Sequence, residues 1–190
     1  GKDTRISSDL LEAALIAGLC SVGSDVKPVG DIPTPAVAYL TRQEKADAGI
    51  VVSASHNPYE HNGIKVFNSQ GYKLSDALEE RVEEKILSKE PMALKTRGEL
   101  GRRHHGMKQL KRDYIDFVAS TIDSDLAGLR ILVDCANGAA SATAPELFGR
   151  FKAHTVFLHR TPDGVNINDR CGSTHLEDLA AQVVKEGYDI

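Results

Sequence analysis

A short polar segment, Ser53-Ala-Ser-His-Asn-Pro58, carries the residues of this chain best suited to chemistry. It follows an apolar run, Ile50 to Val52, that is typical of a buried strand, and its Asn-Pro dipeptide marks a turn. A second turn at Asn62-Gly63 leads into another short strand, so Lys65 should return towards the Ser55 hydroxyl. A nucleophile, a cation and several donors at the mouth of a sheet suit the handling of a phosphoryl group. Taken alone, these residue types more often build an ordinary polar turn.

Helices and strands alternate around this segment. Apolar spacing and capping residues predict helices at about 8–19, 35–44, 75–87, 107–122, 142–150 and 175–187. Short apolar runs predict strands at 26–29, 50–52, 64–67, 130–135 and 154–159, with a further strand beginning at 188. We expect the first helix to start at an N-cap, Ser8, and to turn an apolar stripe towards the core. The third helix should do the same with Leu78, Val82, Ile86 and Leu87.

This order of elements predicts an α/β fold. From residue 107 onwards, strand–helix–strand–helix–strand with short loops is typical of a right-handed parallel α/β unit. The stretch 89–106 has several glycines and little apolar periodicity, which indicates a linker. We therefore predict two α/β domains, 1–106 and 107–190, each a mixed or mainly parallel sheet flanked by helices. Ligands of such sheets lie at the carboxyl ends of the strands.

Composition and charge exclude several classes of function. A net charge of -4, with 41% hydrophobic and 26% charged residues, gives no general attraction for nucleic acid or anionic membrane. The one basic cluster, from Arg97 to Arg112, has no interleaved aromatics, and its His104-His105 pair lacks the spacing of a metal-binding helix. No apolar run approaches the length of a membrane span, and we expect no signal peptide. Three widely spaced cysteines suit free thiols, so we expect a cytoplasmic protein.

Two further segments hold groups that could take part in chemistry. The strand-to-helix turn at 133–141 resembles a phosphate-binding turn, but it matches no Walker or dinucleotide pattern. Close packing between strand and helix accounts better for its Gly138. Cys171 shows no sign of activation as a nucleophile, so a packed thiol is the favoured interpretation. Residues 173–175 on the same loop stay open as neighbours of an active site.

The run from Ala48 to Phe67 resembles the phosphoserine loop of the α-D-phosphohexomutases. Its Ser-Ala-Ser-His-Asn-Pro motif is highly specific, and the likeness extends over nearly all 190 residues. The supporting segments are Gly1–Ser7, Pro33–Pro35, Ala38–Arg42, Ala46–Gly49, Asp163-Gly164, Asn166–Asp169 and Cys171–His175. They narrow the resemblance to the bacterial phosphoglucosamine mutase branch of the superfamily. The likeness is weakest at 89–112, where we assign no function.

The resemblance implies a reversible two-step phosphoryl transfer. Ser55 would carry a phosphate, give it to glucosamine 6-phosphate, and take the other phosphate back from the resulting 1,6-bisphosphate. The product, glucosamine 1-phosphate, would serve synthesis of UDP-N-acetylglucosamine and cell-wall precursors. Mg²⁺ would bind an oxygen of the phosphate on Ser55, as Lewis acid and template. Lys65 aligns with the general acid/base of the family. His56 and Asn57 would orient the phosphate, and Arg5 would support the loop.

The resemblance also places parts of such an enzyme outside this chain. A Thr-Asp-Gly-Ile-Arg-Gly segment would precede Gly1, and an Asp-Gly-Asp-x-Asp-Arg metal loop would follow Ile190 within a few residues. Sugar recognition would belong to two further domains. We therefore expect the 190 residues alone to be inactive. The partners compatible with the resemblance are a phosphosugar substrate and a second copy in a homodimer, without nucleic acid or membrane.

Two other interpretations stay open on the sequence. A phosphomannomutase or phosphoglucomutase would use the same loop with another sugar. A non-catalytic α/β binder of sugar phosphates or nucleotides would use the loop without any transfer.

Overall fold

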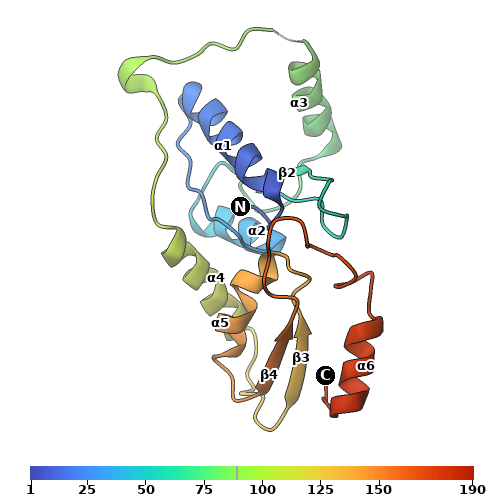
Figure 1. Cartoon of the computed structure of the whole chain (residues 1–190). Coiled ribbons are helices and arrows are strands. Elements are labelled where there is room, and N and C mark those ends of the chain that lie inside the picture. The colour runs from blue at the N-terminus through green and yellow to red at the C-terminus, as the bar shows by residue number, and fades with distance from the viewer. Residues whose placement is uncertain (89) are drawn as a thin grey trace.

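A computed structural model describes residues 1–88 and 90–190 of the chain. Figure 1 shows two groups of elements, one around the N-terminal helices and one around a strand pair nearer the C-terminus. The helices are α1 (Ile6–Ser21), α2 (Thr34–Gln43), α3 (Asp76–Ser88), α4 (Met107–Ser120), α5 (Ala144–Phe148) and α6 (Glu177–Glu186). The strands are β1 (Ala48–Val52), β2 (Ile64–Asn68), β3 (Arg130–Asp134) and β4 (His154–Leu158). Two short 3-10 turns, η1 (Arg97–Glu99) and η2 (Ala139–Ala142), complete the order.

The first unit is built on an antiparallel pair with a parallel neighbour. β1 and β2 pair antiparallel, with Val52 opposite Ile64 and Val51 opposite Lys65. On the other side of β1, Lys2 forms parallel bridges to both Val52 and Asp31. The sheet is therefore mixed. The start of the chain and the end of β1 lie side by side in it.

The core of the first unit lies where α2 packs on β1. Pro35 occupies the first turn of α2, where its missing N–H costs nothing. The helix then buries one face against the strand. The buried residues that form this cluster are Val29, Ile32, Ala36, Val37, Leu40, Val51 and Leu110. Burial of these apolar side chains holds β1 rigidly, which matters because the polar loop begins at its last residue.

The second unit is the parallel α/β unit that the sequence predicts. β3 and β4 run parallel, and η2 and α5 make the crossover between them. The end of the chain lies along the other edge of β3, because Asp189 N–H donates to Arg130 O and Leu132 N–H donates to Ile190 O, each over 2.8 Å. Both units thus confirm the predicted α/β class.

Helix α4 contacts both units. Its Leu110 belongs to the core of the first unit, and the ring of Phe117 stacks on Tyr39 of α2 with centroids 4.1 Å apart. The same helix packs against α5 of the second unit. A division between residues 106 and 107 therefore passes next to a helix that serves both cores, and the predicted domain bounds stay a prediction.

The predicted N-cap of the first helix is wrong by three residues. α1 begins at Ile6 with Arg5 as its N-cap, whereas Ser8 lies buried inside the first turn. The Ser8 hydroxyl donates to the Asp3 carboxylate over 3.0 Å and so makes a tertiary contact in place of a cap. The apolar stripe is also less buried than expected, since Leu10 is 72% exposed.

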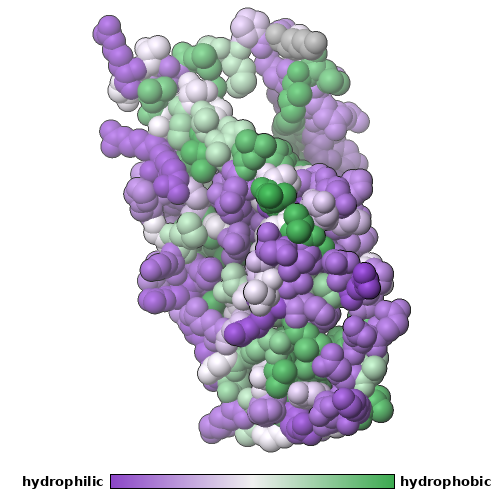
Figure 2. Space-filling model, in the orientation of Figure 1, coloured by the Kyte–Doolittle hydropathy of each residue, from purple (hydrophilic) through white to green (hydrophobic). Residues whose placement is uncertain are grey.

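Two other expectations are corrected. No strand forms at 26–29, where Val26 makes only an isolated bridge to Arg103. The apolar residues of α3 do not face inward, for Ile86 and Leu87 are 71% and 76% exposed and no residue of the helix is buried. Within the described residues no element covers this face, and Figure 2 shows hydrophobic side chains at the surface beside it.

The predicted linker at 89–106 is mostly irregular, and its residue 89 lies outside the described residues. Its end is tied to the first unit, since His104 Nε2 lies 2.9 Å from a carboxylate oxygen of Asp25. None of the helices described combines the length and the apolar character that a membrane crossing requires.

Candidate active site

The loop 53–63 joins β1 to β2 and presents Ser55 to solvent. Its base is closed by Ser53 N–H, which donates to Gly63 O over 2.8 Å. Ser55 N–H donates to the Ser53 hydroxyl over 3.1 Å, so the first turn is held by a side chain. Ser55 itself has φ +57°, a left-handed conformation that residues other than glycine rarely adopt. Strain of this kind persists only where surrounding contacts impose it, and it is concentrated at functional sites.

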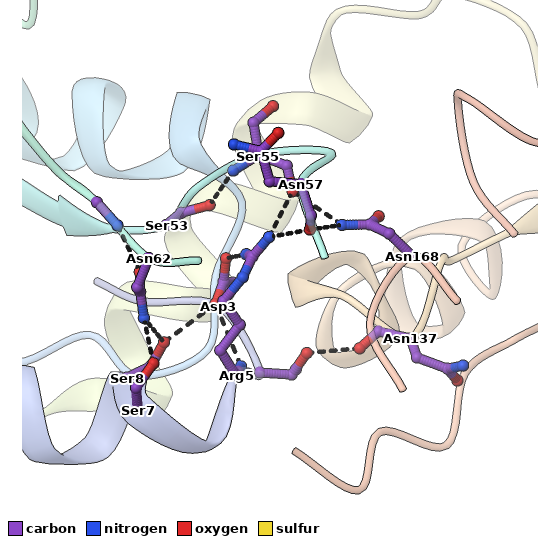
Figure 3. A network of polar contacts seen from close by, with 12 residues as sticks. Asp3, Arg5, Ser7, Ser8, Ser53, Ser55, Asn57, Asn62, Asn137 and Asn168 are labelled. Carbon is purple, nitrogen blue, oxygen red and sulfur yellow. Dashed lines mark hydrogen bonds and ion pairs between the residues drawn. The ribbon is translucent and has the colours of Figure 1, made fainter. Parts of the chain in front are cut away.

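Arg5 supplies the first of those contacts from beneath the loop. Its side chain is fully buried, and its guanidinium forms an ion pair with Asp3. Its Nη2 donates to the backbone carbonyls of Ser55, over 3.1 Å, and Asn57, over 2.5 Å (Figure 3). A buried charge is tolerated when it is paired and hydrogen-bonded. Here the Nη2 group of Arg5 serves the two loop carbonyls, while its buried Nε has no partner among the described residues. The structure thus places Arg5 where it can support the loop.

Asp3 is in turn held by the start of α1. One of its carboxylate oxygens accepts from Arg5 N–H over 3.2 Å and from the Ser8 hydroxyl over 3.0 Å. The far side of the loop joins the same network, because Asn62 Nδ2 donates to the hydroxyls of Ser7 and Ser8 over 2.9 and 3.1 Å. The network therefore ties both ends of loop 53–63 to the first turn of α1.

A contact that sequence reasoning missed comes from the second unit. Asn168 Nδ2 donates to the same two carbonyls, those of Ser55 and Asn57, over 3.0 Å each (Figure 3). The available signal was its place on the loop after β4, at the carboxyl end of a strand, within a segment that already carried the family resemblance. Nothing local to residue 168 indicated which segment it would contact.

The remaining predicted residues lie at the loop without a bond to Ser55. Lys65 is exposed, and its ammonium donates to Ser53 O over 3.2 Å, at the base of the loop. His56 and Asn57 are exposed at the tip. The contacts of the described residues therefore bring together Ser55, Asn57 and Arg5. Lys65 lies next to that group, and the direction of its ammonium is set by a backbone carbonyl.

A second polar cluster lies at the carboxyl ends of β3 and β4. The ligand atoms of Asp134, His159 and Cys171 lie within 4.8 Å of one another. The Asp134 carboxylate already accepts from Ala136 N–H and Gly172 N–H, over 2.8 Å each, and its Oδ1 lies 3.0 Å from His159 Nδ1. Because its oxygens have these partners, the cluster is best described as a hydrogen-bonded corner, which joins two strand ends to the loop that carries Asn168.

The thiols of Cys171, in this corner, and of Cys135, next to it, are held protonated. Burial, reinforced by the Asp134 carboxylate, raises the pKa of Cys171 to about 11 and that of Cys135 to about 11. A nucleophilic thiol needs the opposite environment. This agrees with the interpretation of Cys171 as a packed thiol.

Mg²⁺ fits only one part of this site. It prefers oxygen ligands, commonly one or two carboxylates together with phosphate oxygens. An exposed Ser55 could offer a phosphate oxygen once phosphorylated. The cluster of three ligand types found among the described residues, Asp134, His159 and Cys171, includes nitrogen and sulfur, which suit softer metals.

The apolar cavity of the first unit plays no part in this geometry. It measures about 550 Å³ and lies between α1, α2 and β1, lined in part by Leu15, Leu19 and Val37. No residue of loop 53–63 lines it. The candidate chemistry is therefore at the surface, where the two units meet.

Comparison with known proteins places this arrangement in a family. Residues 1–92 match the family model described as phosphoglucomutase/phosphomannomutase, alpha/beta/alpha domain I. Residues 1–92 are thus similar to the first domain of the phosphohexomutases, and the whole chain aligns with proteins of that family. Among individual relatives, a phosphoglucosamine mutase of Acetivibrio thermocellus is 56% identical over 191 residues, and one of Desulforamulus reducens is 52% identical. Both alignments cover 100% of this chain but only 42% and 43% of the relatives, so the chain spans less than half of their length.

Solved structures agree on the fold. A phosphoglucomutase/phosphomannomutase family protein from Burkholderia thailandensis matches 97% of this chain and 40% of its own, with a TM-score of 0.76 and 26% identity. A structure named a phosphomannomutase from Thermus thermophilus matches all of this chain with a TM-score of 0.79 and 20% identity. The arrangement of two α/β units is therefore that of the family.

Proposed function

We propose that this chain is the nucleophile-bearing part of a phosphoglucosamine mutase, with Ser55 as the residue that carries the phosphate. The observation that carries the proposal is the exposed, left-handed Ser55, whose carbonyl is held by a buried arginine and by an asparagine of the second unit. The chain's 56% identity to a phosphoglucosamine mutase supports this choice of activity.

The proposed reaction moves one phosphoryl group at a time. The bond between phosphorus and the Ser55 oxygen breaks as phosphorus bonds to the 1-hydroxyl oxygen of glucosamine 6-phosphate. That hydroxyl loses a proton, and the serine oxygen gains one. After the 1,6-bisphosphate reorients, the 6-phosphate returns to Ser55 by the reverse exchange and leaves glucosamine 1-phosphate. Such transfers need little covalent help, so positioning and charge stabilisation are the protein's main tasks.

Lys65 is the proposed carrier of that proton. Its ammonium lies at the base of the loop, bonded to Ser53 O, within the unit that holds Ser55. As a cation it stabilises negative charge on the transferring oxygens, and as a neutral amine it accepts the proton of the sugar hydroxyl. His56 and Asn57 at the exposed tip are proposed to donate to the phosphate, while Arg5 keeps the carbonyls behind them in place.

The metal and the wider assembly are part of the proposal. Bound Mg²⁺ would supply Lewis-acid stabilisation of the transferring oxygens, and the Ser55 phosphate is the part of its ligand set that this chain would provide. We propose a phosphosugar substrate, a cytoplasmic homodimer without nucleic-acid or membrane partners, and domain bounds at 1–106 and 107–190. The remaining metal ligands and the sugar-selecting residues would lie in other segments of the enzyme.

The test uses the complete enzyme that contains this chain. Intact mass should show a species heavier by about 80 Da, one HPO₃ group, that maps to Ser55. Ser55→Ala should remove both that species and turnover, whereas Ser69→Ala, an exposed serine just beyond β2, should leave both in place. Turnover by Ser55→Ala would exclude Ser55 as the nucleophile.

Choice of sugar needs a separate measurement, because relatives of this fold include a named phosphomannomutase. We expect kcat/KM to be highest for glucosamine 6-phosphate. A higher value for glucose or mannose phosphates would favour the phosphoglucomutase or phosphomannomutase alternative. Binding of sugar phosphate without any transfer would favour the non-catalytic alternative.

A further inference from the structure

Two donors from different units bind the same pair of carbonyls. Arg5 Nη2 and Asn168 Nδ2 each donate to Ser55 O and Asn57 O, over distances of 2.5 to 3.1 Å. Figure 3 shows the two side chains converging on the loop from opposite sides. We propose that Asn168 is a positioning residue, which ties the nucleophile loop to the second unit and holds Ser55 in its left-handed conformation. This inference rests on the proposed function of Ser55.

The loop needs the second donor because its conformation is costly. A non-glycine residue with φ near +57° is strained and returns to a relaxed conformation unless its neighbours prevent this. Arg5 alone offers one nitrogen to two acceptors. With Asn168, each carbonyl has two donors, and the peptide groups 55–56 and 57–58, which carry these carbonyls, cannot rotate without losing bonds to both units.

Asn168 is itself held in place by the corner defined by Asp134, His159 and Cys171. Its backbone N–H donates to Ala136 O over 3.0 Å, directly after β3. Asp134 binds Gly172 N–H on the same loop, over 2.8 Å. Asn168 has φ +59°, which asparagine tolerates better than most residues. The loop that carries the Asn168 amide is therefore held by hydrogen bonds to the ends of the parallel strands β3 and β4.

Strained residues are concentrated around this loop. Besides Asn168, the segments that meet here contain several non-glycine residues with positive φ, namely Ala136, Asn137, His159 and Arg170. Such a concentration of strained residues beside Ser55 is typical of functional sites, where the surrounding structure imposes the backbone conformation. Small displacements of a reacting group cost large factors in rate, so a residue that fixes the loop acts on turnover without touching substrate.

In the part of the chain that the structure describes, three sets of hydrogen bonds connect the units at this junction. Thr4 Oγ1 donates to Asn137 O over 2.5 Å, and Ile6 N–H donates to Gly164 O over 2.8 Å. The third is the Asn168 amide on the loop carbonyls. Among these contacts of the described residues, the third alone reaches the nucleophile loop, so its loss should leave the units docked and the loop held by Arg5 alone.

The experiment replaces Asn168 in the complete enzyme. Asn168→Gly allows the same left-handed backbone conformation without strain and removes the side-chain amide. Asn168→Asp keeps the shape but turns a carboxylate oxygen towards two carbonyls. Asp169→Asn is the control, because its exposed side chain lies on the same loop and makes no bond to loop 53–63 among the described residues. Turnover and hydrogen exchange of peptides from 53–63 are measured for each variant.

We expect Asn168→Gly to lower kcat about tenfold with KM within about twofold, the loss that one or two hydrogen bonds would cause. Asn168→Asp should lower it further, and both should speed exchange in 53–63 while the control matches the parent. A kcat and exchange rate equal to the control in both variants would overturn the inference. If the parent enzyme shows no mutase turnover, the proposed function fails. Exchange then still decides the inference: faster exchange in Asn168→Gly supports it, and unchanged exchange overturns it.

Discussion

The two supports of the nucleophile loop differ in almost every physical respect. Arg5 belongs to the first unit, is fully buried, and carries a charge neutralised by Asp3. Asn168 belongs to the second unit, is half-buried, and is neutral. Yet both donate to the carbonyls of Ser55 and Asn57. The difference suggests a division of labour, in which Arg5 couples the loop's shape to folding of the first unit and Asn168 couples it to docking of the second.

The largest expected effect is the loss of turnover on replacing Lys65, a change that leaves both supports of the loop in place. Lys65 is exposed and belongs to neither of them. In the complete enzyme, Lys65→Ala should lower kcat by about 10²–10⁴-fold, the usual contribution of a general acid/base. Thermal unfolding should hardly change, because an exposed side chain contributes little to stability. Lys73→Ala, at an exposed lysine paired with Glu79, serves as the control. Equal kcat values in the two variants would assign the proton transfer to another residue.

The next effect tests the buried support. Asp3→Asn leaves the Arg5 charge buried without its partner, which should lower the free energy of unfolding by about 3 kcal/mol. Asp9→Asn is the matched control, since Asp9 also pairs with a cation but its side chain is 83% exposed, and its loss should cost less than about 1 kcal/mol. Thermal unfolding of the complete enzyme measures both. If the two variants unfold alike, the buried pair is not what couples the loop to the first unit.

A smaller effect tests whether the corner of Asp134, His159 and Cys171, which holds Asn168 in place, is closed to solvent. Because the pKa of Cys135 and of Cys171 is raised to about 11, only about one part in a thousand of each is thiolate at pH 8. Iodoacetamide at pH 8 should therefore label the partly exposed Cys20 first. Mass mapping of the peptides identifies the labelled cysteine. Labelling of the two buried thiols should rise as the pH approaches 11. Labelling of Cys171 as fast as Cys20 at pH 8 would show that this corner opens in solution.

The sequence was informative where function depends on neighbours along the chain. β1, the polar loop and β2 form one continuous segment, so strand patterns and turn residues predicted all three. The parallel second unit followed from the alternation of its elements. Arg5 was proposed as a support for the loop only through the family resemblance, since 50 residues separate it from Ser55.

The errors share a physical cause. Ser8 is a good capping residue by type, but its hydroxyl is used by Asp3, a tertiary contact that local reasoning cannot see. The apolar pattern of α3 predicts burial, yet burial depends on which element covers the face. Asn168 was missed because its partner is 113 residues away. Contacts of that range are decided by how the two units pack, which no spacing along the chain records.

The tripeptide Thr4-Arg5-Ile6 works as a lever between the units. Thr4 and Ile6 are bonded to the second unit, and Arg5 between them is bonded to the loop. Neighbouring Cα atoms are only about 3.8 Å apart, so any rocking of the second unit reaches the guanidinium within one residue. The segment that docks the second unit is therefore the same segment that holds the Ser55 carbonyl, so the position of the second unit and the orientation of that carbonyl are coupled.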